Sequence, residues 1–264
     1  MTEDTPRPSG IVSEAASAFT VVVPAVDEEA RVGDVVRECW RGGAARVIVA
    51  EGGSTDRTVD VASEAGAEVV AVSTLAPGGA SLGKGDALWR AVALVDTPIT
   101  VFLDGDLFID GAEFLSLLIA PLTVPTVVLS KASFERVRPS GIPPEPGRIT
   151  QLVAQPLLGL LHPSLARMTE PLSGQIAART EVLRQLSFEV DYGLEIGMLL
   201  DVVDRFGPES VAHPDCGVLG HLSQTEAALG AMSAQVMSAA LRRAEVAAPG
   251  DTRPPARPPH DPPR

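Results

Sequence analysis

The sequence predicts an α/β protein with a doubly wound, mostly parallel sheet and a smaller, mostly helical lobe. Between residues 19 and 104, apolar β-branched segments of strand length alternate with segments of helical periodicity. Glycine, serine, threonine and aspartate occur where one kind of segment gives way to the other. This alternation is typical of parallel sheets with helices on both faces, whose ligands bind at the carboxyl ends of the strands.

Four strands are expected in the first half of the chain. Each is a short apolar run rich in valine or isoleucine, as fully buried strands require. They are FTVVVPA at 19–25, ARVIVA at 45–50, AEVVAV at 67–72 and PITVFLD at 98–104.

Three helices are expected between these strands. Asp27 can cap the first helix, and Ser54 or Thr55 can cap the second, which ends at Gly66. GKGDALWRAVALV predicts the third helix. The apolar face of the first helix carries Val32, Val35, Val36 and Cys39.

The regular alternation of strand and helix patterns ends near residue 124. VPTVVLSKASFERV predicts a strand, SGIPPEPG a proline-rich loop, and the segments from GRITQLVAQPLLGLL onward are expected to be mainly helical, PLSGQIAARTEVLRQL among them. The last sixteen residues hold seven prolines and cannot build a packed element. We therefore expect a nucleotide-binding half at 18–130, a mostly helical acceptor-binding half at 131–243, and disordered tails at 1–17 and 244–264.

Composition excludes several classes of function. A net charge of −13 disfavours binding to nucleic acid, which needs a basic face. Cys39 and Cys216 are the only cysteines and show no zinc or disulfide spacing. The first ten residues lack the order of a signal peptide, and acidic residues interrupt the most apolar region, so we expect a cytoplasmic protein that does not bind membranes.

Polar clusters follow three of the predicted strands. AVDEE follows the first, EGGSTD the second, and DGD the fourth. At single positions such as Asp27, Ser54 and Asp56, a helix cap is a more common explanation than a ligand. Because the carboxyl ends of parallel strands share one edge, the convergence of three clusters favours a binding site there.

Asp104, Gly105 and Asp106 form the most informative cluster. In an extended segment, residues two apart point to one face, so both carboxylates can be presented together. Two hard oxygen donors suit Mg²⁺ or Mn²⁺, which leave open positions for substrate phosphates and neutralise a departing diphosphate. The alternative is a β-turn with exposed acids.

Lys84 and His221 are candidate partners of that cluster. Lys84 lies in a glycine-flanked loop at a predicted helix start, where a cation and backbone N–H groups can meet an anion, although the loop lacks the Walker A pattern. A solvated lysine is the alternative. His221 is a possible third metal ligand, although a lone histidine more often packs or lies at the surface. His213 and His260 have weaker claims.

Taken together, these segments resemble the GT-A glycosyltransferases, whose Asp-x-Asp motif holds a metal on a nucleotide-sugar diphosphate. More narrowly, the chain resembles the retaining glucosyl-3-phosphoglycerate synthases of glycosyltransferase family 81. The likeness runs from about residue 19 to about residue 240. It is carried by VVVPAVDEEARVGDVV, VIVAEGGSTDRT, GKGDALWRA, VFLDGDL, GRITQLVAQPLLGLLHPSL, PLSGQIAA, YGLEIGMLLD and LGAMSAQV.

The resemblance implies roles for residues at matching positions. The donor pocket would be formed by Pro24, Ala25, Val26, Glu28, Glu51, Gly53, Ser54, Lys84, Asp104, Gly105, Tyr192 and Glu195. The metal would be held by Asp106, His221 and Asp104, and the acceptor by Gly147, Arg148, Thr150 and Ser223. Lys84, Asp104, Asp106 and Glu195 would be catalytic. No residue declares itself a covalent nucleophile, so front-face substitution is the family expectation, as is a homodimer.

Four departures from the family pattern bear on specificity. Glu51 replaces the usual aspartate of the family, Gln175 replaces a glutamate, and Leu219 replaces an arginine. After His221, Leu222 and Ser223 begin the segment where the family has basic and amide residues. Losing an arginine near a diphosphate removes a charge-assisted bond. The donor or the acceptor can therefore differ from that of the family.

The sequence thus predicts metal-dependent, retaining transfer of a hexose, glucose first, from a UDP-sugar to a small phosphorylated hydroxy acid such as 3-phosphoglycerate. One alternative is the same fold with another donor or acceptor, and another is a nucleotide-binding relative without activity. A haloacid-dehalogenase-like phosphatase is less favoured, because its usual Gly-Thr after the aspartates is replaced by Leu107 and Phe108.

Overall fold

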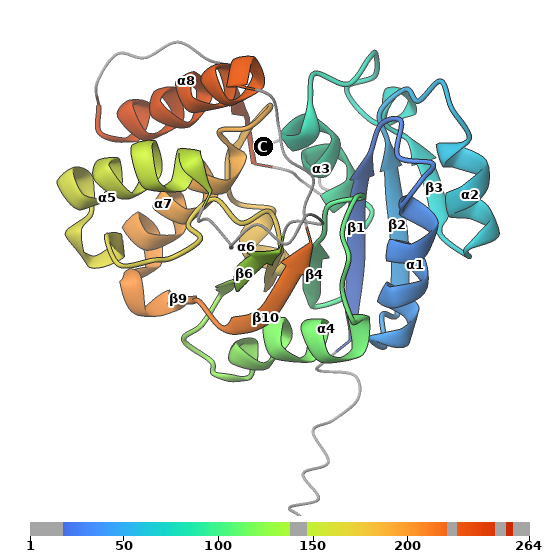
Figure 1. Cartoon of the computed structure of the whole chain (residues 1–264), viewed down its shortest axis with the longest axis horizontal. Coiled ribbons are helices and arrows are strands. Elements are labelled where there is room, and N and C mark those ends of the chain that lie inside the picture. Colours follow the sequence, from blue (N-terminus) through green and yellow to red (C-terminus); the bar gives the residue numbers. More distant parts are fainter. Residues whose placement is uncertain (1–17, 138–146, 221–225, 246–251, 256–264) are drawn as a thin grey trace, which may run out of the picture.

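The protein is built around a seven-stranded mixed sheet with helices on both faces (Figure 1). The computed structural model describes residues 18–137, 147–220, 226–245 and 252–255. The strands of the sheet, in spatial order, are β3 (Glu68–Ala71), β2 (Arg46–Glu51), β1 (Phe19–Ala25), β4 (Ile99–Phe102), β7 (Ile176–Arg179), β5 (Leu129–Lys131) and β9 (Val211–Ala212). Within this sheet β7 runs antiparallel to its neighbours β4 and β5, whereas the other pairs are parallel.

The remaining elements surround the sheet. Two further strand pairs are β10 (Asp215–Gly220) with β6 (Ser133–Val137), and β11 (Thr252–Arg253) with β8 (Phe188–Glu189). The α-helices are α1 (Val32–Arg41), α2 (Thr58–Glu64), α3 (Lys84–Val92), α4 (Gly111–Ile119), α5 (Gln155–Leu161), α6 (Thr180–Leu183), α7 (Leu194–Phe206) and α8 (Glu226–Arg243). Short helical turns are η2 (Val72–Thr74), η3 (Ala120–Thr123), η4 (Thr150–Ala154), η5 (Pro163–Leu165) and η6 (Pro208–Ser210).

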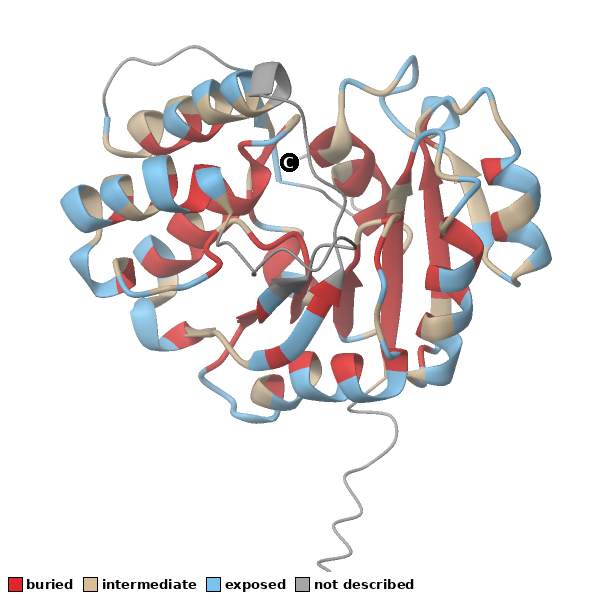
Figure 2. Cartoon of the chain, viewed as in Figure 1, coloured by how far each residue is buried: buried red, intermediate tan, exposed pale blue. Residues whose placement is uncertain are grey.

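Alternation along β1 divides the core into two layers. Val21 and Val23 pack with α1 and α4 on one face, and Val22 packs with α3 and α7 on the other. A strand covered on both faces needs apolar residues at consecutive positions, which explains the valine run in FTVVVPA. Figure 2 shows the resulting buried strands between exposed outer helical faces.

The predicted fold class is confirmed, and α5, α7 and α8 group into a helical lobe beside the parallel strands (Figure 1). No helix within the described ranges is long and apolar enough to span a membrane. The division at residue 130 remains a prediction.

Three sequence-based expectations were wrong. PLSGQIAARTEVLRQL was expected to be helical, but its middle forms β7, where pairing with both β4 and β5 overrides the helix propensity of its alanines. Residues 124–137 form two strands, β5 and β6, which belong to different sheets. The C-terminal tail was expected to be disordered, yet Thr252 and Arg253 form β11.

The predicted helix caps are also corrected. Helix α1 begins at Val32 after Arg31, and α2 begins at Thr58 after Arg57, so neither Asp27 nor Ser54 or Thr55 occupies a cap position. Asp27 instead adopts a positive φ of 55° and its carboxylate accepts a hydrogen bond from the backbone N–H of Thr55 at 2.7 Å. These polar residues join the loops after β1 and β2 to each other, which shapes the edge where the site lies.

Candidate active site

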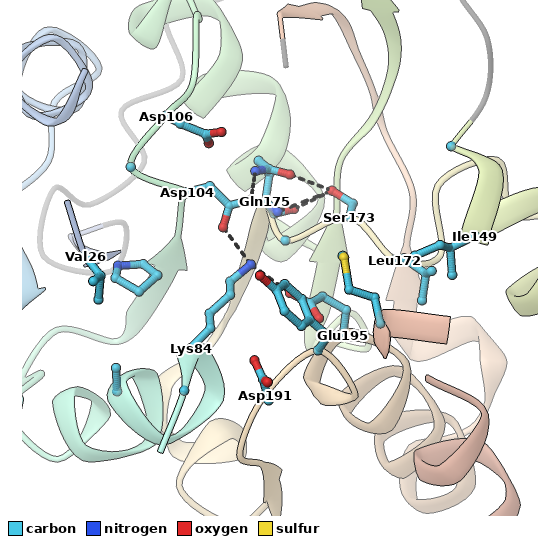
Figure 3. A pocket seen from close by; sticks show the side chains of 18 of the residues that line it. Val26, Lys84, Asp104, Asp106, Ile149, Leu172, Ser173, Gln175, Asp191 and Glu195 are labelled. Carbon is cyan, nitrogen blue, oxygen red and sulfur yellow. Dashed lines mark hydrogen bonds and ion pairs between the residues drawn. The ribbon is translucent and has the colours of Figure 1, made fainter. Parts of the chain in front are cut away.

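A cavity of about 760 Å³ opens at the carboxyl ends of β1, β2 and β4 (Figure 3). Its walls come from these strand ends, the start of α3, the segment before β7, the start of α7 and the inner face of α8. Thirteen of the residues predicted from sequence line it: Pro24, Ala25, Val26, Glu28, Lys84, Asp104, Gly105, Asp106, Gly147, Arg148, Thr150, Tyr192 and Glu195.

Lys84 lies at the centre of the cavity between two carboxylates. Its Nζ is 2.6 Å from Oδ1 of Asp104 and 2.8 Å from Oε1 of Glu195. Burial disfavours the charge on Lys84, but the two carboxylates outweigh this effect and raise its pKa. The ammonium group therefore stays charged and faces the site.

A glycine makes this arrangement possible. A Cβ atom at Gly174 would lie 2.6 Å from Nζ of Lys84 and 2.9 Å from Oδ2 of Asp104. Both distances are shorter than real Cβ contacts, so a side chain at position 174 would push Lys84 and Asp104 from their present positions, whereas glycine lets the segment before β7 pass over the ion pair.

Gln175 adds a second partner for Asp104. Its Nε2 donates to Oδ2 of Asp104 at 2.8 Å, and its Oε1 accepts from the hydroxyl of Ser173 at 3.2 Å (Figure 3). A glutamate at position 175 would oppose Asp104, whereas the amide donates to it. Gln175, which replaces the usual glutamate of the family, therefore stabilises the position of Asp104 through a hydrogen bond without adding a charge.

Lys131 lies behind this segment. Its Nζ donates to the carbonyl of Ser173 at 2.8 Å, and the side chain is fully buried on β5. Burial lowers its pKa to about 7, with the charge of Lys84 acting in the same direction and Glu195 opposing. Lys131 is therefore a buried supporting group for residues 173–175.

Negative charge concentrates around Asp106. Burial raises the pKa of Glu28 to about 7, and the charges of Asp106 and Asp104 add to this rise. Carboxylate oxygens are the donors that Mg²⁺ and Mn²⁺ prefer, so Asp104 and Asp106 offer the donor chemistry for such an ion, and a further ligand is needed to complete the site. Asp104 and Asp106 lie in a turn after β4 and not in an extended strand, yet both line the cavity.

The predicted third metal ligand, His221, lies outside the described residues, as do Leu222 and Ser223. Among described side chains, no group of three or more histidine, cysteine, aspartate or glutamate residues is arranged to hold an ion. The role of His221 stays a prediction. Leu219 is fully buried in the apolar layer with α1 and α4 and does not line the cavity.

Three predicted donor-site residues lie beside the cavity instead of lining it. Oε1 of Glu51 accepts hydrogen bonds from the backbone N–H groups of Gly53, at 2.6 Å, and Ser54. The hydroxyl of Ser54 accepts from the N–H of Asp27 at 3.1 Å. Within the described chain Gly52, and not these three residues, lines the cavity after β2. Glu51 therefore shapes the loop after β2.

Sequence reasoning missed several lining residues. Leu172, Ser173, Asp191 and Met232 all line the cavity, although they carry no recognisable pattern of their own. The available signal was their position beside assigned residues: Leu172 and Ser173 fall within PLSGQIAA, and Asp191 directly precedes Tyr192.

The chain is similar to known glycosyltransferases. The family described as Glycosyltransferase like family 2 matches residues 16–126. The glucosyl-3-phosphoglycerate synthase of Mycolicibacterium paratuberculosis is 38% identical over 254 residues, covering 90% of this chain and 77% of that protein. The synthase of Mycolicibacterium smegmatis is 38% identical over 250 residues, covering 90% and 82%.

Solved structures give the same result. The Mycobacterium tuberculosis glucosyl-3-phosphoglycerate synthase in complex with Mn²⁺, UDP and glucosyl-3-phosphoglycerate matches with a TM-score of 0.84 at 33% identity, covering 96% of this chain and 97% of that one. The complex of that synthase with Mn²⁺, UDP-glucose and phosphoglyceric acid matches with a TM-score of 0.84 at 34% identity, covering 95% and 96%. With this likeness over most of its length, the chain belongs to the glucosyl-3-phosphoglycerate synthase family and has its GT-A fold.

Proposed function

We propose that this protein is a metal-dependent glucosyltransferase that moves glucose from UDP-glucose to 3-phosphoglycerate. The observation that carries the proposal is Lys84, charged and held between Asp104 and Glu195, in the same cavity as Asp106 and Arg148. Relatives with this name and structures bound to Mn²⁺, UDP-glucose and phosphoglyceric acid support the choice of substrates.

Each side of the cavity suits one part of the reaction. The backbone and side chains of Pro24, Ala25 and Val26 offer a surface for the uridine. Asp106 and Asp104, with His221 as the predicted third ligand, would hold Mg²⁺ or Mn²⁺, which when bound neutralises charge on the diphosphate. Lys84 faces the same diphosphate and stabilises the charge that develops on it as it leaves.

The acceptor side carries its own cation. Arg148 and Thr150 line the cavity at the start of the helical lobe, next to Gly147 and the apolar Ile149. A guanidinium group binds phosphate through two parallel hydrogen bonds. We infer that Arg148 fixes the phosphate of the acceptor and so directs its hydroxyl toward the donor sugar.

We infer that transfer proceeds with retention and without a glycosyl-enzyme intermediate. Glu195 and Asp104, two carboxylates at the centre of the cavity, are both paired with Lys84. A carboxylate in such a pair is a weak nucleophile, because the ammonium group stabilises its charge. This supports attack by the acceptor hydroxyl on the same face that the diphosphate leaves.

From the sequence we also propose a cytoplasmic location and a homodimer. The structure offers a candidate surface for the dimer contact, because Leu152 on η4 and Leu160 on α5 are 73% and 81% exposed. Light scattering of the purified chain measures the mass directly, and a monomer at micromolar concentration would reject the dimer.

The function is tested by a transfer assay with UDP-, GDP- and ADP-glucose, with and without Mn²⁺, and with 3-phosphoglycerate as acceptor. We expect product with UDP-glucose and Mn²⁺ and none from Asp106→Ala. Asp60→Ala, at a 67% exposed carboxylate on α2, is the matched control. Tight UDP binding without transfer from any donor would identify a non-catalytic relative, and release of inorganic phosphate without nucleotide sugar would identify a phosphatase.

A further inference from the structure

A short C-terminal segment folds back onto the wall of the cavity. We call residues 252–255 the C-terminal clasp. Thr252 and Arg253 pair antiparallel with Glu189 and Phe188 of β8. On its other side the clasp contacts α3, where the indole N–H of Trp89 donates to the carbonyl of Pro254 at 2.5 Å. The clasp therefore bridges β8 and α3.

Arg253 anchors the clasp to a buried carboxylate. Its Nε donates to Oδ1 of Asp86 at 2.7 Å. Asp86 is fully buried, and its Oδ2 is bound by Arg90 at 2.8 Å and by the backbone N–H of Leu82 at 3.0 Å. Burial alone would raise the pKa of Asp86, but these donors together lower it. Removing one of its cationic partners would leave the buried charge of Asp86 partly uncompensated, which is destabilising.

Asp86 connects the clasp to the central lysine of the cavity. Asp86 lies two residues after Lys84, and its carboxylate accepts a hydrogen bond from the backbone N–H of Leu82, which lies two residues before Lys84. The carboxylate therefore closes the turn that starts α3. The backbone N–H of Asp86 also donates to the carbonyl of Val190 at 3.0 Å. The orientation of Lys84 is thus set by a turn that Arg253 helps to hold.

Helix α3 and β8 meet without room for adjustment. A Cβ atom at Gly85 would lie 1.9 Å from the carbonyl oxygen of Glu189. The chain that continues from β8 carries Tyr192 and Glu195 into the cavity. A tie between α3 and β8 therefore fixes Lys84 relative to Glu195, the carboxylate 2.8 Å from it.

We propose that Arg253 is a positioning residue, and that the C-terminal clasp holds Lys84 in place for the leaving diphosphate through Asp86. This inference rests on the proposed glucosyl transfer. It gives a role to a proline-rich tail that contributes no residue to the cavity within the described chain.

The test compares Arg253→Met, Arg253→Lys and the control Arg37→Met in the full chain. Arg37 pairs with Asp34 on α1 and its side chain is 58% exposed. Because displacing a catalytic group by about 1 Å costs on the order of 100-fold in rate, we expect kcat of Arg253→Met to fall about 10- to 100-fold with an unchanged acceptor KM. Arg253→Lys should recover most of kcat, and Arg37→Met should match wild type.

A double-mutant cycle separates positioning from folding. In an Asp86→Asn background, Arg253→Met should lower kcat by less than about threefold more, because both changes break one connection. Additive losses, or a kcat for folded Arg253→Met within twofold of wild type, would overturn the proposal. Should Arg253→Met fail to fold, Trp89→Phe removes the donor to Pro254 and reduces the ring beneath the Arg253 guanidinium, which lies 5.5 Å from the ring centroid in the wild type. A several-fold lower kcat then supports the clasp, and an unchanged kcat rejects it.

Trp89 reports the clasp independently of turnover. In a Trp40→Phe background it is the only tryptophan, and we expect its emission to shift to longer wavelength in Arg253→Met as the segment detaches. If wild-type protein transfers no glucose, the proposed function fails, and this shift still tests whether the clasp is docked. If transfer occurs and neither the emission nor kcat changes in Arg253→Met, the proposed role of the clasp is rejected, whereas the proposed glucosyl transfer is not.

Discussion

Replacing Lys131 with methionine should abolish a specific pH dependence of folding stability. Lys131 is fully buried, and burial lowers its pKa to about 7 from an ordinary value of 10.5. Its ammonium group contacts the carbonyl of Ser173 at 2.8 Å. Methionine fills a similar volume without the charge, so the substitution removes the titration with little change in packing.

The sign follows from proton binding. Between pH 7 and pH 10.5 the unfolded chain keeps the proton on Lys131 and the folded chain does not. Stability therefore rises with pH through this window and is lost as pH falls toward 7. The full difference is about 5 kcal/mol, of which about 2 kcal/mol falls between pH 7 and pH 9. At pH 7 the stability of the wild type is still about 4 kcal/mol below its value at high pH, and the methionine variant avoids this deficit. The variant also loses about 1 kcal/mol of stability, because it lacks the hydrogen bond to Ser173.

Urea unfolding at pH 7, 8 and 9 measures the effect. We expect the free energy of unfolding of wild type to rise by about 2 kcal/mol relative to Lys131→Met across this range. Only two lysines occur in the chain, Lys84 and Lys131, so ¹⁵N spectra of lysine-labelled protein can follow the ammonium group directly. Parallel stability curves for the two proteins, or an ordinary pKa in the spectra, would refute the reasoning.

Three further substitutions test the geometry of the site. Gly85→Ala should destabilise the fold by at least about 1–3 kcal/mol in urea unfolding, because its Cβ would lie 1.9 Å from the carbonyl oxygen of Glu189; wild-type stability would contradict that close approach. Arg148→Ala should raise the acceptor KM about 10- to 100-fold in steady-state kinetics with little change in kcat, whereas an equal fall in kcat would point to a role in the chemical step. Glu28 has a pKa near 7, so Mn²⁺–UDP binding should release a proton and tighten as pH rises toward 7; calorimetry in two buffers should show this release in wild type and not in Glu28→Gln, and its persistence there would assign it to another group.

The parallel half of the fold was predictable because its signals are local. Each of β1, β2 and β4 is made mainly of apolar, largely β-branched residues, and a buried parallel strand favours that pattern. Strand β7 was not predictable in this way. Its residues IAAR form a strand only because β4 and β5 lie on either side of it.

Candidate site residues were predictable where a motif or a strand end marked them. Asp104 and Asp106 stand out as acids after an apolar strand. The contact of Lys84 with Glu195 joins residues 111 positions apart, so only the family resemblance brought Glu195 into the site. Composition also misjudged the tail, because Arg253 is held by one buried carboxylate, a tertiary contact that a proline-rich sequence does not reveal.

The charge of the cavity makes a bound cation a condition for tight donor binding. Five carboxyl side chains and two cationic ones are among the described residues that line it: Glu28, Asp104, Asp106, Asp191 and Glu195, with Lys84 and Arg148. Lys84 is already paired with Asp104 and Glu195, so its charge is largely compensated before a diphosphate enters. An anionic diphosphate would then approach a negative surface, which costs free energy unless a divalent ion intervenes.

Removal of metal should therefore weaken UDP binding strongly, and the loss should depend on Asp106. We expect the Kd for UDP to rise at least about 10-fold in EDTA, the equivalent of about 1.4 kcal/mol, by isothermal titration calorimetry. In Asp106→Asn the site is one charge less negative, so UDP should bind without metal more tightly than it binds metal-free wild type, while the gain from Mn²⁺ should shrink. A Kd in EDTA equal to that in Mn²⁺ would mean that protein cations alone hold the diphosphate, and the metal would then have no part in donor binding.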